Sequence, residues 1–301
     1  MDPSISRVAS LNVDNVDLSA SVSWLHKFSP TLKSLYVYPT LSLGSPFFGL
    51  IHSSPLLEDL TIVGYDPFGN DDGVLHGPRI VGPSTSPPLA GSLDLEISAG
   101  VGYAARRLLD LPTGLHFRNL TLTRFHTGDV RWIAELVERC SDTLEYLDIT
   151  CRLPSTYVFI LRHDYTYVLF PVESEPVPID LSKATKLKGA VFRLDSEGIE
   201  WVTLALRTVT PEHRALRQIS IYVPHWFPFL SLGVNIRPVL REENSKRWSD
   251  LDHLLFQFWE SHSIRPRVGC KGLGEKGQNL VHFIGFLFPK TMQRGIIDLD
   301  Y

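Results

Sequence analysis

One short apolar phrase recurs along this chain of 301 residues. Each copy reads apolar-x-x-apolar-x-apolar, and three of the five steps between the six regular copies are 25, 27 and 29 residues long. These copies are Leu32-Leu35-Val37, Leu57-Leu60-Ile62, Phe117-Leu120-Leu122, Leu144-Leu147-Ile149, Leu187-Ala190-Phe192 and Leu216-Ile219-Ile221. Less regular copies are Leu93-Leu95-Ile97 and Val8-Leu11-Val13. A repeat of about 20–29 residues with this pattern is typical of a leucine-rich-repeat solenoid.

Helical patterns alternate with these strand phrases. The segment Thr127–Asp142 carries apolar residues on one helical face, and Thr127 or Asp129 can cap its first turn. Similar patterns predict a second helix that begins near Ser196 and a third that follows Ser249. The repeating unit is therefore strand, turn, helix, turn. It predicts an α/β fold, a leucine-rich-repeat-like solenoid (horseshoe) with a parallel concave sheet and helices on the convex side.

The whole chain, residues 1–301, is interpreted as a single solenoid domain. Residues 64–89 are rich in glycine, proline, serine and aspartate, which indicates a long loop. Residues 153–178 contain β-branched and aromatic runs, which favour a hairpin insertion. Such insertions can join a binding surface or be tolerated surface loops. Residues 247–301 should close one end of the stack, because terminal repeats need a cap.

Strand alternation defines a candidate recognition surface, because residues between the leucine-type positions should line the concave face. The expected first column is Ser34, Asp59, Asn119, Tyr146, Gly189 and Gln218, and the second is Tyr36, Thr61, Thr121, Asp148, Val191 and Ser220. This face is mildly acidic and carries tyrosines, which suits a protein partner with basic or amide character. The candidate partner-binding residues are Tyr36, Asp59, Asp94, Glu96, Asn119, Tyr146, Asp148 and Gln218. The alternative is that they are solvated sheet residues.

No motif predicts an enzyme. Gly272–Gly277 matches G-x-G-x-x-G, and Asp298 follows at the distance expected of a dinucleotide fingerprint. Too few residues follow for the rest of such a domain, so a loop is the favoured interpretation. His163-Asp164 is better explained as a hairpin turn than as a catalytic pair. Without a nucleophile elbow, a phosphate-binding loop or paired histidine and cysteine spacing, we expect no catalytic residue, no metal and no cofactor.

Composition narrows the class of partner and compartment. The chain is 44% hydrophobic and 21% charged, which is enough for a large folded core. A net charge of −4 argues against nucleic-acid binding, which usually needs a basic face. The three cysteines predict no disulfide framework, and the start MDPSISRVAS predicts no signal peptide. No uncharged apolar run is long enough for a membrane span. We expect a cytoplasmic or nuclear protein with no membrane contact.

Two long segments resemble the repeat region of fungal F-box, leucine-rich-repeat-like proteins. They are LPTGLHFRNLTLTRFHTGDVRWIAELVERCSDTLEYLDI and PIDLSKATKLKGAVFRLDSEGIEWVTLALRTVTPEHRALRQISIYVP. The resemblance implies that the repeats select the substrate of a ubiquitin ligase, while an F-box docks the Skp adaptor and a cullin. Because the repeats begin at Val8, only the substrate-binding half is expected here. The alternative is a stand-alone scaffold or regulatory repeat protein with no ligase connection.

The chain departs from the usual repeat at one position. Leucine-rich repeats place asparagine or cysteine at the ninth position, where the side chain supports the turn. The residues here are Thr40, Tyr65, Phe125, Arg152, Asp195 and Pro224. We therefore expect irregular turns after the strands.

Overall fold

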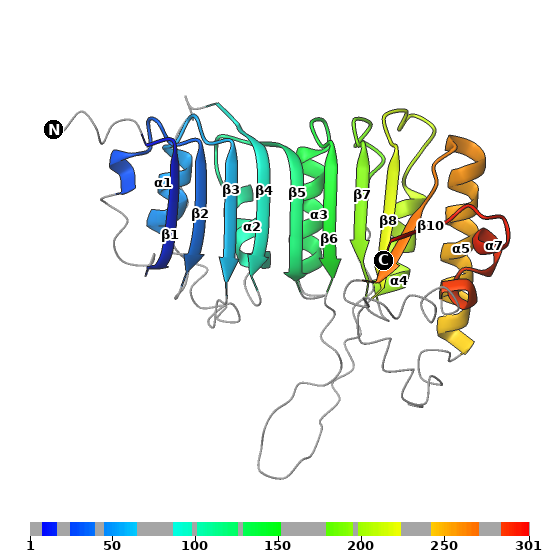
Figure 1. Cartoon of the computed structure of the whole chain (residues 1–301). Coiled ribbons are helices and arrows are strands. Elements are labelled where there is room, and N and C mark those ends of the chain that lie inside the picture. The colour runs from blue at the N-terminus through cyan, green and yellow to red at the C-terminus, as the bar shows by residue number, and fades with distance from the viewer. Residues whose placement is uncertain are drawn as a thin grey trace, which may run out of the picture.

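The strands form one ten-stranded sheet whose spatial order is their order along the chain (Figure 1). The computed structural model describes residues 8–16, 25–39, 45–64, 87–97, 101–125, 129–151, 179–194, 198–223, 242–270 and 284–300. Every neighbouring pair of strands is parallel, which confirms the predicted α/β class. The strands are β1 (Ser10–Val16), β2 (Ser34–Pro39), β3 (Asp59–Gly64), β4 (Leu89–Ile97), β5 (Leu115–Phe125), β6 (Tyr146–Cys151), β7 (Gly189–Arg193), β8 (Gln218–Val223), β9 (Arg267–Cys270) and β10 (Asp298–Asp300).

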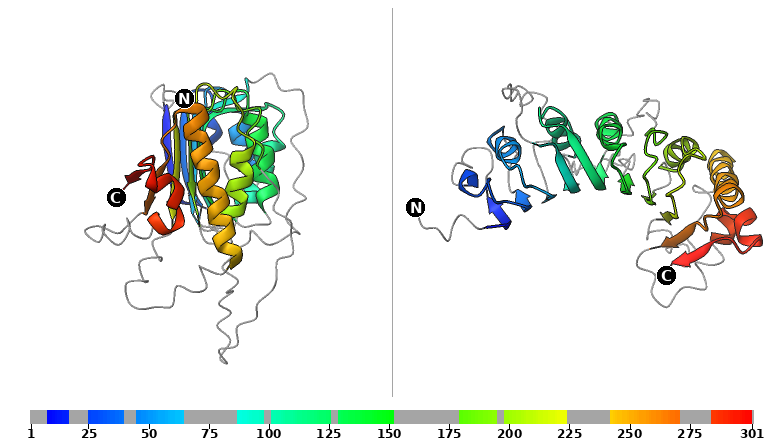
Figure 2. Two further views of the ribbon diagram at one scale, coloured as in Figure 1. Left: turned by 90° about the vertical axis from the view of Figure 1, so that its right-hand side faces the viewer. Right: turned by 90° about the horizontal axis from the view of Figure 1, so that it is seen from above.

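The helices lie on one side of this sheet. Seen from above, the sheet lines the inner side of an arc and the helices lie on its outer side (Figure 2). They are η2 (Leu25–Lys27, a 3-10 turn), α1 (Ser45–His52), α2 (Val101–Leu109), α3 (Val130–Cys140), α4 (Gly198–Arg207), α5 (Glu242–His262) and α7 (Pro289–Gln293). We call the sheet surface that faces away from the helices the inner face.

Strand alternation places the core between the sheet and the helices. The middle apolar residues of the first two regular phrases, Leu35 and Leu60, are paired across the sheet, and Leu60 is paired in turn with Leu93, the first residue of the less regular phrase. Each of these side chains is at most 1% exposed. Burying one leucine stabilises a fold by about 1.5–3 kcal/mol relative to leaving it in water. All eight predicted phrases form strands, because each supplies this row of apolar residues.

Neighbouring units are also joined by threonine side chains. Thr31 donates a hydrogen bond to the carbonyl of Val8 (3.0 Å), and Thr143 donates one to the carbonyl of Phe117 (3.0 Å). Both threonines directly precede the first apolar residue of a phrase, and both reach back to the first apolar residue of the phrase before. This link satisfies a backbone carbonyl at the start of the strands, so it stabilises the stacking of units.

A buried histidine makes a comparable link. His213 is 1% exposed, and its Nε2 lies 2.8 Å from the carbonyl of Leu181. Since its Nδ1 accepts a hydrogen bond from the backbone N–H of Thr210 (3.1 Å), Nε2 is the protonated nitrogen. Thr208 accepts the N–H of Leu181 (2.8 Å). Both backbone groups of Leu181 are therefore held by the next unit.

The predicted helices are present, with two corrections. The third begins at Glu242 rather than after Ser249. Asp129 occupies the N-cap position of α3 but makes no side-chain capping hydrogen bond. Its carboxylate instead lies against Gly102 in the first turn of α2, where a Cβ on the glycine would come within 2.0 Å of Asp129 Oδ1. The expected cap at Thr127 lies outside the described residues.

The C-terminal elements are held together by one buried carboxylate. Asp252 on α5 is 3% exposed and accepts hydrogen bonds from the backbone N–H groups of Lys290 (2.8 Å) and Thr291 (3.1 Å). It also accepts one from the hydroxyl of Thr291 (2.6 Å). Because these N–H groups begin α7, Asp252 satisfies donors that have no partner within their own helix. The strands β9 and β10 then extend the sheet, within the region expected to cap it.

Other predictions fall on segments that the structure leaves out. Residues 65–86 and 152–178, which hold nearly all of the two expected insertions, lie outside the described residues, as does Gly272–Gly277. In the part of the chain that is described, no helix combines the length and the apolar character needed to cross a bilayer.

Candidate recognition surface on the inner face

Side chains of the inner face form aligned rows that run across the strands. The first row is Ser34, Asp59, Ser92, Asn119, Tyr146, Gly189 and Gln218. The second row is Tyr36, Thr61, Asp94, Thr121, Asp148, Val191 and Ser220. Seven of the eight predicted partner-binding residues lie in these rows, and Glu96 lies two residues beyond Asp94 on β4. The expected columns are therefore neighbours in space, and Ser92 completes the first of them.

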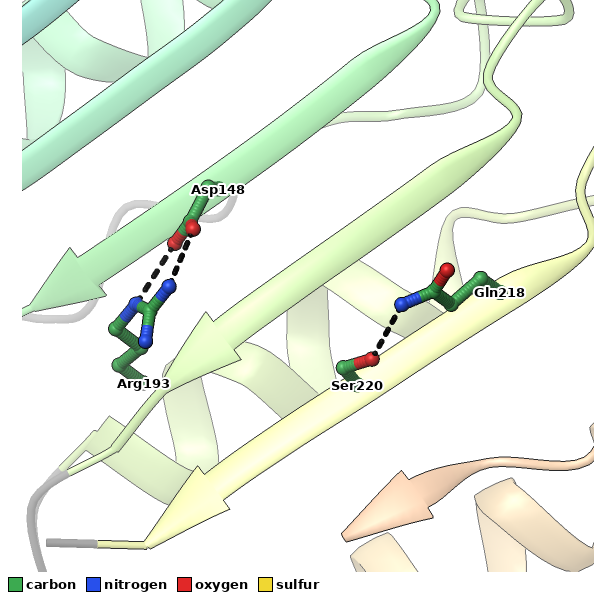
Figure 3. A network of polar contacts seen from close by, with 4 residues as sticks. All are labelled: Asp148, Arg193, Gln218 and Ser220. Atoms are coloured by element: carbon green, nitrogen blue, oxygen red, sulfur yellow. Dashed lines mark hydrogen bonds and ion pairs between the residues drawn. The ribbon is translucent and has the colours of Figure 1, made fainter. Parts of the chain in front are cut away.

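The exposed fraction differs along the rows. Tyr36 (37%) and Tyr146 (50%) are among the exposed large hydrophobic side chains of the described chain. Ser220, which was expected on the concave face as part of the second column, is fully buried. Its hydroxyl accepts a hydrogen bond from Gln218 Nε2 (3.0 Å), which lays the glutamine side chain along β8 (Figure 3).

An ion pair joins strands β6 and β7 in the middle of the inner face. Arg193 on β7 donates two hydrogen bonds to Asp148 on β6, from Nε to Oδ1 (3.1 Å) and from Nη2 to Oδ2 (2.6 Å) (Figure 3). The guanidinium carbon also lies 5.1 Å from the centre of the Tyr222 ring. Both charged side chains are about three-quarters buried. Asp148 is therefore first a structural partner of Arg193, a role that the sequence did not reveal.

A second carboxylate on the inner face, that of Asp94, has a different environment from that of Asp148. Burial raises the pKa of Asp94 from 3.8 to about 6, and the negative charges of Glu96 and Asp148 raise it in the same direction. Its Oδ1 atom is buried without a hydrogen-bond partner, and Asp94 forms no ion pair with any described residue. A cation next to Asp94 would therefore stabilise its charged form.

A hollow opens beside these residues, above the one glycine of the first row. It has a volume of about 90 Å³ and crosses β5 to β8. Its lining comprises Asn119, Leu120, Thr121, Tyr146, Leu147, Asp148, Gly189, Val191 and Gln218. A Cβ on Gly189 would lie 3.1 Å from Tyr146 Cδ1, so any larger residue would crowd the tyrosine ring and narrow the space. We call this feature the Gly189 hollow.

The Gly189 hollow brings together four of the predicted residues, namely Asn119, Tyr146, Asp148 and Gln218. Asn119 is oriented by a hydrogen bond from its Nδ2 to Ser92 Oγ (3.0 Å). Tyr36, Asp59, Asp94 and Glu96 lie on the same face but do not line the hollow. Gly189 was absent from the predicted site because it has no side chain. The sequence feature that could have revealed the hollow is a glycine that stands between Tyr146 and Gln218 in the first row.

The surface combines an apolar hollow with polar groups at its border. Among the residues that the structure covers, no group of three or more histidine, cysteine, aspartate or glutamate side chains could hold a metal ion. The surface instead offers an aromatic wall, two amides and an incompletely satisfied carboxylate. Comparison with protein families, with curated proteins and with solved structures finds no match to this chain.

Proposed function

We propose that this protein is a recognition module of the leucine-rich-repeat type, and that it binds another protein on the inner face. The observation that carries the proposal is the Gly189 hollow, which lies beside the half-exposed Tyr146 on the sheet surface that the helices leave uncovered. Exposed aromatic residues next to a well-formed hollow are typical anchors of protein interfaces.

Two features support the leucine-rich-repeat class. The apolar phrases recur with the strands, and each strand pairs with the next one along the chain. The sheet also lies on the inner side of the arc (Figure 2), which is where such repeats bind their partners.

The resemblance to fungal F-box proteins suggests the biological role. We propose that this chain is the substrate-binding repeat region of an F-box-type ubiquitin ligase subunit. In that role the inner face would select a protein for ubiquitination, and the Skp adaptor and a cullin would be recruited through an F-box.

Affinity purification of the tagged full chain from its native cells tests both parts. The comparison is between the wild type, Tyr146→Ala and the control Trp259→Ala, which removes an aromatic residue of similar exposure (37%) from helix α5. A protein that is captured by the wild type and the control but lost with Tyr146→Ala supports recognition on the inner face. Equal capture by all three would refute it.

The same purification separates the two biological roles. Co-purification of the Skp adaptor with wild type and Tyr146→Ala alike supports the ligase assignment, because the adaptor would bind outside the inner face. Recovery of a Tyr146-dependent partner without the adaptor would instead support a stand-alone scaffold.

A further inference from the structure

The Gly189 hollow and the Asp94 carboxylate lie on the same face and in adjoining rows. The hollow is centred between β6 and β7, whereas Asp94 is on β4. Strands in a sheet are about 4.8 Å apart, so two and a half spacings place the two features about 12 Å from each other. Both could therefore be reached by one short segment of a partner.

The hollow is suited to an aliphatic side chain. Leu120 and Leu147 have their side chains buried in the core, so it is their backbone that contributes to the floor of the hollow. Val191 and Thr121 add methyl groups, and the ring of Tyr146 forms one wall. A volume of about 90 Å³ is several times the space that one water molecule needs. A leucine-sized group would gain apolar contacts there, whereas a charged side chain would lose part of its hydration shell.

The surface near Asp94 is suited to a cation. The charged residues of the two rows on β1 to β6 are Asp59, Asp94 and Asp148, all of them acidic, and Glu96 follows Asp94 on β4. Arg193 already neutralises Asp148. The Oδ1 atom of Asp94 is buried without a hydrogen-bond donor, whereas the side chain as a whole is only partly buried. An arginine or lysine of a partner that reaches the accessible part of this carboxylate would supply a hydrogen bond and a positive charge.

We propose that the inner face binds an extended segment of a partner protein that places an aliphatic side chain in the Gly189 hollow and an arginine or lysine on Asp94. The inference rests on the proposed recognition function and specifies its ligand. The segment crosses the strands along the rows. An extended chain advances about 3.3 Å per residue, so a cation about four residues from the aliphatic anchor spans the required distance and lies on the same side of the segment.

Charge complementarity disfavours a second copy of this chain as the occupant. The chain carries a net charge of −4, and the charged residues of the two rows on β1 to β6 are all acidic. A basic segment gains attraction over the whole approach, which raises its association rate and its selectivity.

Selection from a phage-displayed library of random peptides of about a dozen residues tests the proposal, because such libraries sample extended segments without prior choice of partner. The bait is the full chain. We expect enriched peptides to pair leucine, isoleucine or methionine with arginine or lysine four positions away. Gly189→Ala, which narrows the hollow, and Tyr146→Ala, which removes its wall, should both weaken the aliphatic preference. Asp94→Asn should abolish the basic preference.

Glu260→Gln is the matched control, since it removes an exposed carboxylate from helix α5, on the opposite side of the sheet from the inner face. It should leave the enriched sequences unchanged. For the best peptide, anisotropy should show a loss of about tenfold in affinity with Asp94→Asn and less than about twofold with Glu260→Gln. No enrichment, an enrichment without this spacing, or equal effects of the two variants would overturn the inference. If a native partner nevertheless depended on Tyr146, the recognition function itself would stand.

Discussion

Arg193 binds both carboxylate oxygens of Asp148 and thereby ties β7 to β6, the neighbouring strands that are separated by the longest stretch outside the described residues. The two strands are held by backbone hydrogen bonds over only five residue pairs. A bidentate, largely buried pair at the end of this short ladder fixes the strand register and the position of the Gly189 hollow.

Replacement of Arg193 by methionine should therefore destabilise the fold. We expect a loss of about 1–2 kcal/mol, because Asp148 would remain partly buried without its partner. Lys183→Met is the control, since Lys183 pairs with Glu138 at the surface and both side chains are more than half exposed. It should cost about 0.5 kcal/mol or less. Chemical denaturation of the two variants measures the difference, and equal losses would show that the Arg193 pair contributes no more than a surface ion pair.

Asp94 should make the stability of the fold depend on pH. Its pKa is raised from 3.8 to about 6 in the folded state, so between these values the folded chain binds more protons than the unfolded chain. Stability should consequently fall as the pH rises from about 4 to about 6, and then stay lower. Asp94→Asn removes this loss and should stabilise the protein at neutral pH by about 1 kcal/mol, a value reduced for solvent screening of a partly exposed group.

Thermal melting of wild type and Asp94→Asn across this pH range provides the measurement. The advantage of the variant should shrink as the pH approaches 4. Asp59→Asn, on the same face, serves as the reference for loss of an acidic charge. A difference in melting temperature between Asp94→Asn and wild type that stays constant with pH would contradict the assigned role of Asp94.

Two helical glycines should respond to alanine in opposite directions. At Gly102 in α2 a Cβ would come within 2.0 Å of Asp129 Oδ1, so Gly102→Ala forces the carboxylate away and should cost about 1–3 kcal/mol. At Gly49 in α1 no atom lies within 4 Å of the added carbon, and Gly49→Ala should stabilise the protein by about 0.5–1 kcal/mol through helix propensity. Denaturation curves of the two variants give both signs, and stabilisation by Gly102→Ala would mean that Asp129 moves at no cost.

Asp252 should control the attachment of the C-terminal elements. Asp252→Ala removes the acceptor for the N–H groups of Lys290 and Thr291 and for the threonine hydroxyl. We expect a loss of about 2–3 kcal/mol and faster hydrogen exchange in residues 284–300 than elsewhere. Asp250→Ala, two positions away and half-exposed at 3.9 Å from Arg207, is the control and should have little effect. Exchange that rises evenly over the whole sheet would argue against a local role.

The sequence was most informative where a strand has to bury every second side chain. The eight apolar phrases predicted eight strands and the face to which Tyr146 and Gln218 belong. Helices α1 and α2 were not predicted. The first, Ser45–His52, is short and almost uniformly apolar, so it lacks the polar face that marks a surface helix. The second, Val101–Leu109, follows β4, whose phrase Leu93-Leu95-Ile97 departs from the regular spacing and obscured the repeat.

The chemistry of the site depends on contacts between distant residues, which a pattern within one strand cannot reveal. Asp148 and Arg193 are 45 positions apart and meet only because β6 and β7 are neighbours. The raised pKa of Asp94 depends in part on Asp148, which lies two strands away. The Gly189 hollow arises from a missing side chain between two large neighbours. The positions of residues in the rows were therefore predictable from the sequence. The ion pair of Asp148 with Arg193, the raised pKa of Asp94 and the empty volume at Gly189 could be found only from the structure.

The strand order also bears on how such a chain can change its length. Each of the eight inner strands bonds only to the strand before it and the strand after it in the sequence. Duplication or loss of one whole strand–helix unit would thus create a single new junction and leave the other pairings intact. A binding surface that spans β4 to β8 could be preserved while the ends of the sheet are extended or trimmed, so the reach of the protein and the specificity of its central face can evolve separately.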